Sequence, residues 1–326
     1  MNTNRRSFLK QAGVGVAAAY LTPSLFSCAS QPPVASVREL GLQLYTLRDQ
    51  LAENPTKTLA RVAEIGYNHV ETFGAEINMG GKATFWGLNV GSLRRQLDEN
   101  RLETHSGHYL LDEFLTPGNG SEELLKRYID TAAELGQRYL IAPVPPLLLI
   151  DKLTADDYRF MADQLNKGGT LAAKAGLKVG YHNHFWEFRT LADGSKGLDI
   201  LIDNTDSDLV VFELDLFWSE KSGTDSLSYF EQYPGRFPLW HIKDMDPDNT
   251  APVIGPDYDN KSVMEITSAI TYAEVGTGSI DFKKIMAEGK TAGLQYAFVE
   301  QDVITIDPFE SVAKSHDYAM AELINK

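Results

Sequence analysis

The chain of 326 residues contains one cysteine, Cys28, so an intramolecular disulfide cannot stabilise its fold. Basic side chains are also scarce: 30 Lys and Arg stand against 45 Asp and Glu, which leaves a formal net charge of -15. This deficit argues against nucleic acid as a partner, because phosphate contacts need clustered Lys and Arg. It argues equally against adhesion to anionic lipid headgroups. After the first thirty residues, no apolar run is long enough to span a bilayer.

The first thirty residues predict an export leader that is separate from the fold. Residues 4–10 (NRRSFLK) follow a twin-arginine export pattern, and the apolar stretch at 12–21 is too short to span a bilayer. Residues 25–28 (LFSC) resemble a bacterial lipoprotein cleavage site, which predicts lipidation of Cys28 and attachment to a membrane through that anchor alone. The alternative is a stray small residue within a signal peptide. In both cases we predict an exported protein, either periplasmic or a membrane-anchored lipoprotein.

The rest of the chain alternates short β-rich runs with segments of helical periodicity, which predicts a repeating βα architecture. Within 121–135, for example, Leu124, Tyr128, Ala132 and Leu135 fall on one helix face. The predicted strands are 40–47, 69–73, 102–107, 139–144, 178–183, 209–215, 238–243 and 295–301.

Four predicted helices end alike, with a glycine where a left-handed helix stop is needed and a strand beginning shortly after it. These glycines are Gly66, Gly136, Gly176 and Gly293. Together with the eight strands they predict an α/β fold, a single-domain (β/α)8 TIM barrel over residues 36–326. A doubly wound sheet is the main alternative, but it usually has a glycine-rich turn after its first strand, which residues 45–48 lack. The long segments 73–91 and 246–277 are predicted to be loops over the active site.

Ionisable side chains gather at the ends of the predicted strands, where (β/α)8 enzymes place their working residues. Five of the seven histidines fall at three strand ends. Imidazole together with carboxylate suits Mn, Co, Fe, Zn or Ni better than Ca, which prefers oxygen alone. The alternative is a polar barrel mouth without a metal, but so many bare carboxylates would repel one another. The residues concerned are Glu71, His105, His108, His182, His184, Glu187, Glu213, Asp215, His241, Lys243, Asp244, Glu300 and Asp302.

Several stretches, taken in order, resemble the xylose-isomerase-like TIM barrel superfamily, the sugar phosphate isomerase/epimerase group that includes inosose dehydratases and ketose 3-epimerases. They are GLQLYTL (41–47), GYHNHFWEF (180–188), ELDLFW (213–218), WHIKD (240–244) and GTGSIDF (276–282). The resemblance implies a TIM barrel enzyme with a small carbohydrate substrate and a divalent metal, which is Mn, Co, Mg, Zn or Fe. It leaves open whether the protein forms a homo-oligomer.

Carried over by position, the family's metal ligands fall on His182, Asp215, His241 and Glu300. The family usually has Glu, Asp, His and Glu, so three positions match and His182 stands where epimerases keep a carboxylate. Epimerases commonly use two carboxylates to move a proton between the faces of a carbon. The departure at His182 therefore makes β-elimination as well supported as isomerisation or epimerisation.

Each of these reactions begins with loss of a proton next to a metal-bound ketone, which forms an enediolate. Glu300 or His184 is the predicted base, and His108 or Lys243 is the predicted acid that assists departure of a β-oxygen group. The predicted function is therefore a metal-dependent sugar isomerase/epimerase or a keto-sugar dehydratase or lyase. A non-catalytic carbohydrate-binding barrel is the alternative.

Four further residues are predicted to contact substrate: Glu71, His105, Glu187 and Trp218. For Glu71 and His105, hydrogen bonds inside the barrel are an equal alternative. Core packing is the favoured alternative for Trp218, and Glu187 can serve as a supporting acid.

Overall fold

The computed structural model describes residues 40–258 and 260–324. The predicted export leader, Cys28 and the predicted barrel boundary at residue 36 lie outside these residues and stay predictions. Within the described ranges, no helix is both long and apolar enough to cross a lipid bilayer.

Eight parallel strands form the central sheet, in the spatial order β2-β1-β13-β10-β9-β8-β7-β6. The two end strands also meet, because the Val70 N–H donates to the Glu103 carbonyl (2.8 Å) and the His108 N–H donates to the Thr72 carbonyl (2.7 Å). The sheet thus closes almost completely into the predicted (β/α)8 barrel. The barrel strands are β1 (Leu40–Gln43), β2 (His69–Glu71), β6 (Ser106–His108), β7 (Tyr139–Ala142), β8 (Lys178–His182), β9 (Val210–Asp215), β10 (Leu239–Ile242) and β13 (Tyr296–Val299).

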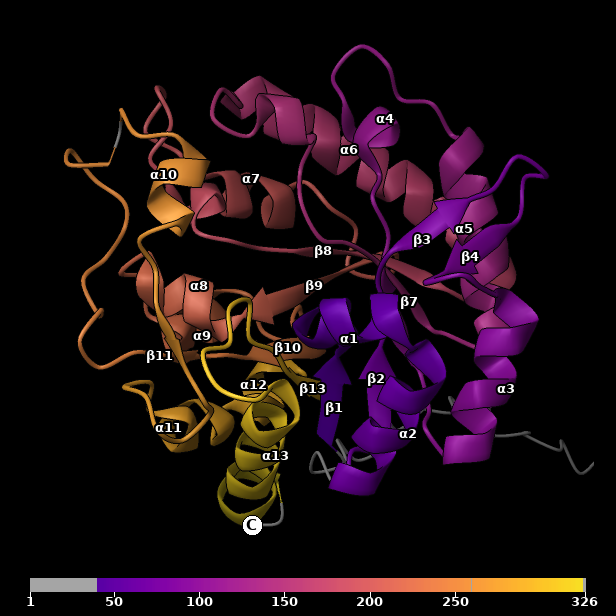
Figure 1. The fold of residues 1–326 in the computed structure, drawn as a ribbon. Coiled ribbons are helices and arrows are strands. Elements are labelled where there is room, and N and C mark those ends of the chain that lie inside the picture. The colour runs from indigo at the N-terminus through magenta and orange to yellow at the C-terminus, as the bar shows by residue number, and fades with distance from the viewer. Residues whose placement is uncertain (1–39, 259, 325–326) are drawn as a thin grey trace, which may run out of the picture. The chain divides into compact units, whose positions relative to one another are not determined.

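Helices connect the strands and lie around the outside of the barrel (Figure 1). Gly66 and Gly136 end two of them in the left-handed conformation, with φ of 118° and 77°, and Gly176 and Gly293 do the same. The four predicted helix stops are therefore confirmed. The α-helices are α1 (Arg48–Glu53), α2 (Pro55–Ile65), α3 (Val90–Asn100), α4 (Asp112–Leu115), α5 (Glu123–Leu135), α6 (Ala155–Ala172), α7 (Gly197–Asp203), α8 (Leu216–Lys221), α9 (Ser226–Gln232), α10 (Val263–Thr267), α11 (Phe282–Met286), α12 (Gly289–Ala292) and α13 (Pro308–Ala319). Shorter turns are the 3-10 helices η1 (Leu44–Leu47), η2 (Leu147–Leu149), η3 (Ala173–Ala175) and η4 (Trp186–Phe188), and the π-helix η5 (Met320–Ile324).

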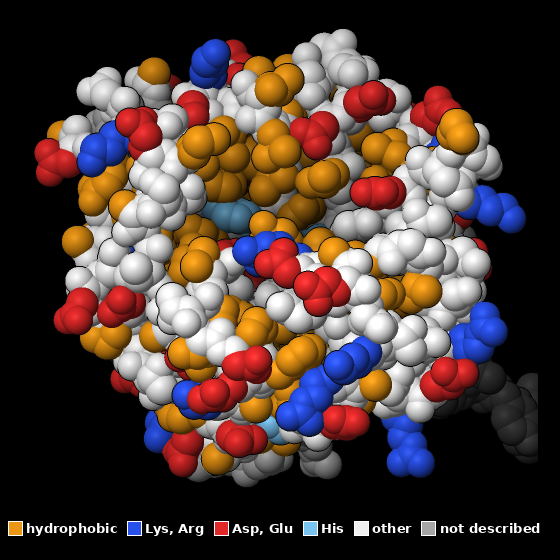
Figure 2. Space-filling view, in the orientation of Figure 1, with side chains coloured by type: hydrophobic (Ala, Val, Ile, Leu, Met, Phe, Trp, Pro, Cys, Tyr) orange, Lys and Arg blue, Asp and Glu red, His pale blue; other side chains and the backbone are white. Residues whose placement is uncertain are grey.

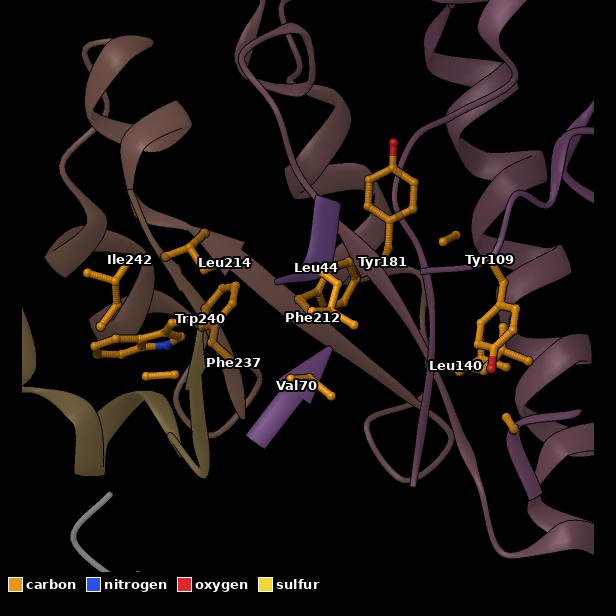
Figure 3. Close-up of a cluster of buried hydrophobic side chains, with 14 of the residues drawn as sticks. Leu44, Val70, Tyr109, Leu140, Tyr181, Phe212, Leu214, Phe237, Trp240 and Ile242 are labelled. Carbon is orange, nitrogen blue, oxygen red and sulfur yellow. The ribbon is translucent and has the colours of Figure 1, made fainter. Parts of the chain in front are cut away.

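Side chains alternate across each barrel strand, and this alternation separates the main core from the barrel interior. The outward residues, such as Val70, Tyr181, Phe212 and Trp240, are buried between the strands and the helices (Figure 3). Most of the apolar stabilisation of the fold lies in this outer layer, because its contiguous cluster contains most of the buried apolar side chains.

Inside the barrel, a small separate apolar cluster fills the half that contains the amino ends of the strands. Ile141, Val211, Leu239 and Phe298 belong to it. Gly41 makes room for this plug, since a Cβ at that position would lie only 2.1 Å from the Phe298 ring. The next inward positions along β9, β10 and β13 are Glu213, His241 and Glu300, and His182 of β8 pairs with Glu213, so the polar layer begins directly above the apolar plug.

Three predicted segments differ in detail from the structure. The first predicted strand ends at Gln43 instead of residue 47, because the Gln43 side chain accepts a hydrogen bond from the Tyr45 N–H and the chain turns into η1. The predicted loop 73–91 contains a three-stranded antiparallel sheet of β3 (Ala75–Ile77), β4 (Ala83–Phe85) and β5 (Leu88–Asn89). In the other long segment, β12 (Tyr272–Ala273) pairs with β11 (Asp244–Met245).

Candidate metal centre

The four side chains predicted as metal ligands lie together at the carboxyl end of the barrel. His182, Asp215, His241 and Glu300 come from or directly follow β8, β9, β10 and β13, which are neighbours in the sheet. Each offers one ligating atom, and these atoms all lie within 4.8 Å of one another. All four side chains are buried. Strand order and side-chain alternation therefore bring the four predicted residues to one point, as the sequence pattern requires.

Glu213, which is buried one inward position below Asp215 on β9, orients the imidazole rings. Its Oε2 atom lies 2.7 Å from His108 Nε2, 3.2 Å from His182 Nδ1 and 3.3 Å from His241 Nε2. Since an ionised carboxylate only accepts hydrogen bonds, His182 carries its hydrogen on Nδ1. Its Nε2 lone pair is then directed to the side of Asp215, whose Oδ2 is 3.7 Å away.

His241 is held between carboxylates on both sides. Its Nε2 lies 2.8 Å from Glu71 Oε2, and its Nδ1 lies 2.9 Å from Glu300 Oε2. Glu71 is fixed in turn by the Gln43 side chain, which donates to the same Oε2 at 2.7 Å. This chain of contacts leaves Nδ1 of His241 as the nitrogen that faces the other predicted ligands.

Lys243 supplies positive charge to the same cluster. Its ammonium lies 2.7 Å from Glu300, 2.8 Å from Asp302 and 3.0 Å from Asp215. Burial by itself lowers the pKa of Lys243, but the three carboxylates outweigh it and raise the pKa well above the usual value. Lys243 is therefore charged and bound to these carboxylates, and its contacts position Asp215 and Glu300.

The protonation states of the histidines differ because their neighbours differ. Burial and the charge of His241 lower the pKa of His182 to about 3, so His182 is neutral, as a metal ligand must be. Burial also lowers the pKa of His241, but the charges of Glu213 and Glu300 reverse this and hold that pKa well above its usual range. His241 therefore carries a proton among these carboxylates, and an ion bound there would replace the proton on its Nδ1.

Two observations indicate that these residues suit a divalent metal. Oε1 of Glu71 and Oε1 of Glu213 are buried, and neither accepts a hydrogen bond from the part of the chain that the structure describes. Additional positive charge in the cluster would stabilise such oxygens. In addition, two imidazole nitrogens and two carboxylates form a donor set that suits Mn, Co, Fe or Zn. A second group of four, His108, His182, Glu213 and His241, also has the spacing of a metal site. We favour the first group because Glu213 is already committed to three imidazoles.

A cavity of about 450 Å³ opens onto this cluster and is large enough for a small molecule. His108, His182, His184 and Glu300 line it. His184 stacks on Trp186 with ring centroids 4.2 Å apart, which fixes the orientation of its imidazole. The two histidines predicted as base and acid, His184 and His108, therefore both face the space where a substrate would lie.

Three of the residues predicted to contact substrate lie outside the lining of this cavity. Glu71 is fully buried beneath the cluster, where it holds His241. Glu187 is also fully buried: it accepts hydrogen bonds from the Tyr181 hydroxyl (2.5 Å) and from the His184 N–H (2.8 Å), so it positions His184. Trp218 is buried in an apolar cluster behind His184. None of the three is among the residues that line the cavity, so their contacts support the alternative interpretations: hydrogen bonds inside the barrel, a supporting acid and core packing.

The expectation for His105 is corrected, since it lies at the opposite end of the barrel. It precedes β6, and its ring stacks on Tyr296, the first residue of β13, with centroids 4.3 Å apart. Its carbonyl accepts from the N–H of Tyr139, the first residue of β7. The predicted strand 102–107 begins only at Ser106, and this shift moves His105 from the end of a strand to its start.

Two important residues, Glu213 and Asp302, were absent from the predicted roles. Each lies two positions from a predicted ligand: Glu213 shares the inward face of β9 with Asp215, and Asp302 follows Glu300 in the segment after β13. For Glu213 the two-residue period of the strand was the signal in the sequence.

The sequence model described as xylose isomerase-like TIM barrel matches residues 59–303. Inosose dehydratase from Clostridium perfringens is 28% identical over 169 residues, which are 51% of this chain and 55% of that protein. The chain thus spans about half the length of such curated relatives. Inosose dehydratase from Clostridium beijerinckii is 25% identical over 274 residues, or 76% of this chain and 88% of that protein. Among solved structures, a sugar phosphate isomerase/epimerase from Parabacteroides distasonis is 28% identical with a TM-score of 0.71, covering 90% of this chain and 97% of that one.

Proposed function

Because the chain belongs to the xylose isomerase-like TIM barrel family, we propose that it is a divalent-metal-dependent enzyme that acts on a sugar or keto-sugar through an enediolate. The observation that carries the proposal is the convergence of ligating atoms from His182, Asp215, His241 and Glu300 on four neighbouring strands. Similarity to inosose dehydratases and to a sugar phosphate isomerase/epimerase supports the substrate class.

These four residues would hold Mn, Co, Mg, Zn or Fe as the divalent ion. When bound, such an ion supplies Lewis-acid stabilisation of the negative charge that develops on the substrate's carbonyl oxygen, worth several kcal/mol. Glu213 and Glu71 hold the two imidazoles in the orientation that this requires.

His184 is the proposed base, because its side chain lines the cavity and its imidazole is held there by stacking on Trp186. Glu300, the other predicted base, is instead occupied by Lys243 at 2.7 Å and His241 at 2.9 Å. His184 would accept the proton from the carbon next to the carbonyl, while the electron pair of that C–H bond moves to the carbonyl oxygen.

His108 is the proposed acid, because it lines the same cavity and Glu213 holds its Nε2 at 2.7 Å. In an elimination the carbonyl re-forms, the bond to the β-oxygen breaks, and His108 protonates that oxygen as water or an alcohol leaves. In an isomerisation or epimerisation a proton returns to carbon and no group leaves. Lys243 is a positioning residue in this scheme.

Metal binding tests the first half of the proposal. Purified protein is loaded with Mn, Co or Zn, desalted and analysed for metal content, beside Asp215→Asn and the control Asp163→Asn on the exposed face of α6. We expect one ion per wild-type and control chain and strongly reduced content in Asp215→Asn. Equal metal content in all three proteins would contradict the proposed metal site.

The reaction is tested by NMR in deuterated water with inososes, keto-glycosides and free ketoses as substrates. Deuterium at the carbon next to the carbonyl without loss of a group indicates isomerase or epimerase chemistry. Release of water or of an alcohol indicates a lyase. A metal-loaded protein that neither exchanges a proton nor changes any of these sugars would instead be a binding protein.

A further inference from the structure

The cavity above the candidate metal centre has two unlike halves. Its polar side consists of His108, the last residue of β6, and of His182, His184, Glu300 and Asp302, which belong to or follow β8 and β13. Its apolar side follows β1, β2, β6 and β7, which are contiguous once the sheet closes between β6 and β2. The apolar wall consists of Tyr45, Phe73, Leu110, Pro143, Val144 and Leu147. Figure 2 shows hydrophobic side chains gathered along one side of a hollow in which a histidine is visible.

Three members of this apolar wall are unusually exposed to water. Tyr45 is 39% exposed, Leu110 48% and Leu147 50%, and large apolar side chains exposed to this degree are few in the described ranges. Scattered single exposed leucines need no explanation, but apolar side chains that converge on one cavity indicate a binding surface. The arrangement leaves apolar area in contact with water until a ligand covers it.

The wall is also held in place by contacts behind it. The Tyr45 ring packs edge-on against Phe73, with centroids 5.3 Å apart and planes at 85°. The Arg48 guanidinium lies 4.5 Å from the Tyr45 ring centroid and donates to the Asp302 carbonyl at 2.8 Å. The Leu147 N–H donates to Asp112 at 3.0 Å, which fixes the start of η2. The apolar surface is therefore preorganised before a ligand arrives.

We infer that this wall is the subsite for an aromatic group attached to the sugar, so that the substrate is a keto-glycoside with an aryl aglycone. The inference rests on the proposed function, which places the sugar carbonyl beside His182 and Glu300. A free sugar has hydroxyl groups on all sides, and those that face Phe73, Leu110 and Leu147 would lose their hydrogen bonds to water without replacement. An aryl group instead buries apolar area there and can stack on the Tyr45 ring.

The test compares phenyl and methyl 3-ketoglucosides, which share the sugar and differ only in the group that faces the wall. Binding is measured by calorimetry and turnover by NMR, with metal-loaded wild-type protein. Leu110→Asn and Leu147→Asn alter the wall at half-exposed positions that are not needed for the core. Leu148→Asn is the matched control, because the adjacent Leu148 is 93% exposed and is not among the residues that line the cavity.

We expect wild-type protein and Leu148→Asn to prefer the phenyl glycoside at least about tenfold in binding and in kcat/KM. Each wall variant should lose most of this preference, with less than about a twofold change for the methyl glycoside. Turnover of both compounds with no preference for phenyl would overturn the aryl subsite and leave the proposed function standing. If the protein binds the phenyl glycoside more tightly through the wall but turns over neither compound, the result supports the aryl subsite and contradicts the proposed enzymatic function. Failure of both glycosides to bind would overturn the aryl-glycoside inference, and turnover of inososes or free ketoses would then decide the proposed function separately.

Discussion

Replacing Glu213 by glutamine tests the internal architecture of the centre, because it changes a residue that orients ligands without being one. The substitution keeps the size of the side chain and removes its negative charge. In the structure, Glu213 Oε2 is approached by His108 at 2.7 Å, by His182 at 3.2 Å and by His241 at 3.3 Å. A glutamine can place either its oxygen or its NH2 group at that point, and neither holds the three imidazoles as a carboxylate does.

The expected effect is a loss of metal affinity of about 10–100-fold, the usual result of removing a group that orients a metal-bound histidine. This corresponds to about 1.4–2.8 kcal/mol of binding free energy. Competition with a chromophoric chelator measures the dissociation constant, and circular dichroism shows that the variant is folded. The control is Glu134→Gln, which changes an exposed glutamate near the end of α5.

Two results would refute this reasoning in different ways. Affinity equal to that of the wild type would mean that the hydrogen bond from His182 to Glu213 does not set the ring orientation. A loss far beyond 100-fold would mean that Glu213 is itself a ligand, and the ion would then occupy the second group of His108, His182, Glu213 and His241.

Three further perturbations follow from the structure. Lys243→Met leaves Asp215, Glu300 and Asp302 without their ammonium partner, so the metal-free variant should lose about 3–5 kcal/mol of unfolding free energy. Mn²⁺ should restore part of this loss, which urea titration measures with Lys314→Met as the control. A variant that Mn²⁺ does not stabilise would contradict the prediction. Burial raises the pKa of Glu187 to about 7 in the folded state, so its stabilising contribution is complete below pH 4.5 and about 3 kcal/mol is lost as the pH rises through 7. Glu187→Gln should remove that part of the slope of stability against pH, and parallel curves for the two proteins would argue against it. Gly41→Ala places a Cβ 2.1 Å from the Phe298 ring and should lower the free energy of unfolding by about 1–3 kcal/mol. The control Gly91→Ala on α3 should stabilise the protein slightly. Equal melting temperatures for the two variants would show that the apolar plug rearranges to accept the added methyl group.

The sequence predicted the fold well because its signals are local. Gly66 and Gly136 mark helix ends through the left-handed conformation that glycine readily adopts, and the structure has that conformation at both. Once eight strands are placed in a barrel, residues at their carboxyl ends must converge. This convergence predicts a cluster of ionisable side chains at that end, and the resemblance to the xylose-isomerase-like superfamily implied His182, Asp215, His241 and Glu300 as its metal ligands.

The roles of single residues were harder to predict, since they depend on contacts between distant segments. Glu71, Glu187 and Trp218 have the residue types of a binding site, but each is buried against partners from other parts of the chain. His105 differs from His108 by only three residues, yet a strand that starts at Ser106 places the two at opposite ends of the barrel.

The sequence by itself determined the barrel and its helix stops, because periodicity and glycine conformation act over a few residues. The four candidate ligands came from the resemblance to a known family. Only the tertiary structure decided which carboxylates hold an imidazole and which remain as candidate ligands for an ion. That choice depends on distances of about 3 Å between strands far apart in the sequence, such as those from Glu213 to His108 and from Lys243 to Glu300. The apolar wall likewise arises only when the segments after β1, β2, β6 and β7 meet around the closed sheet.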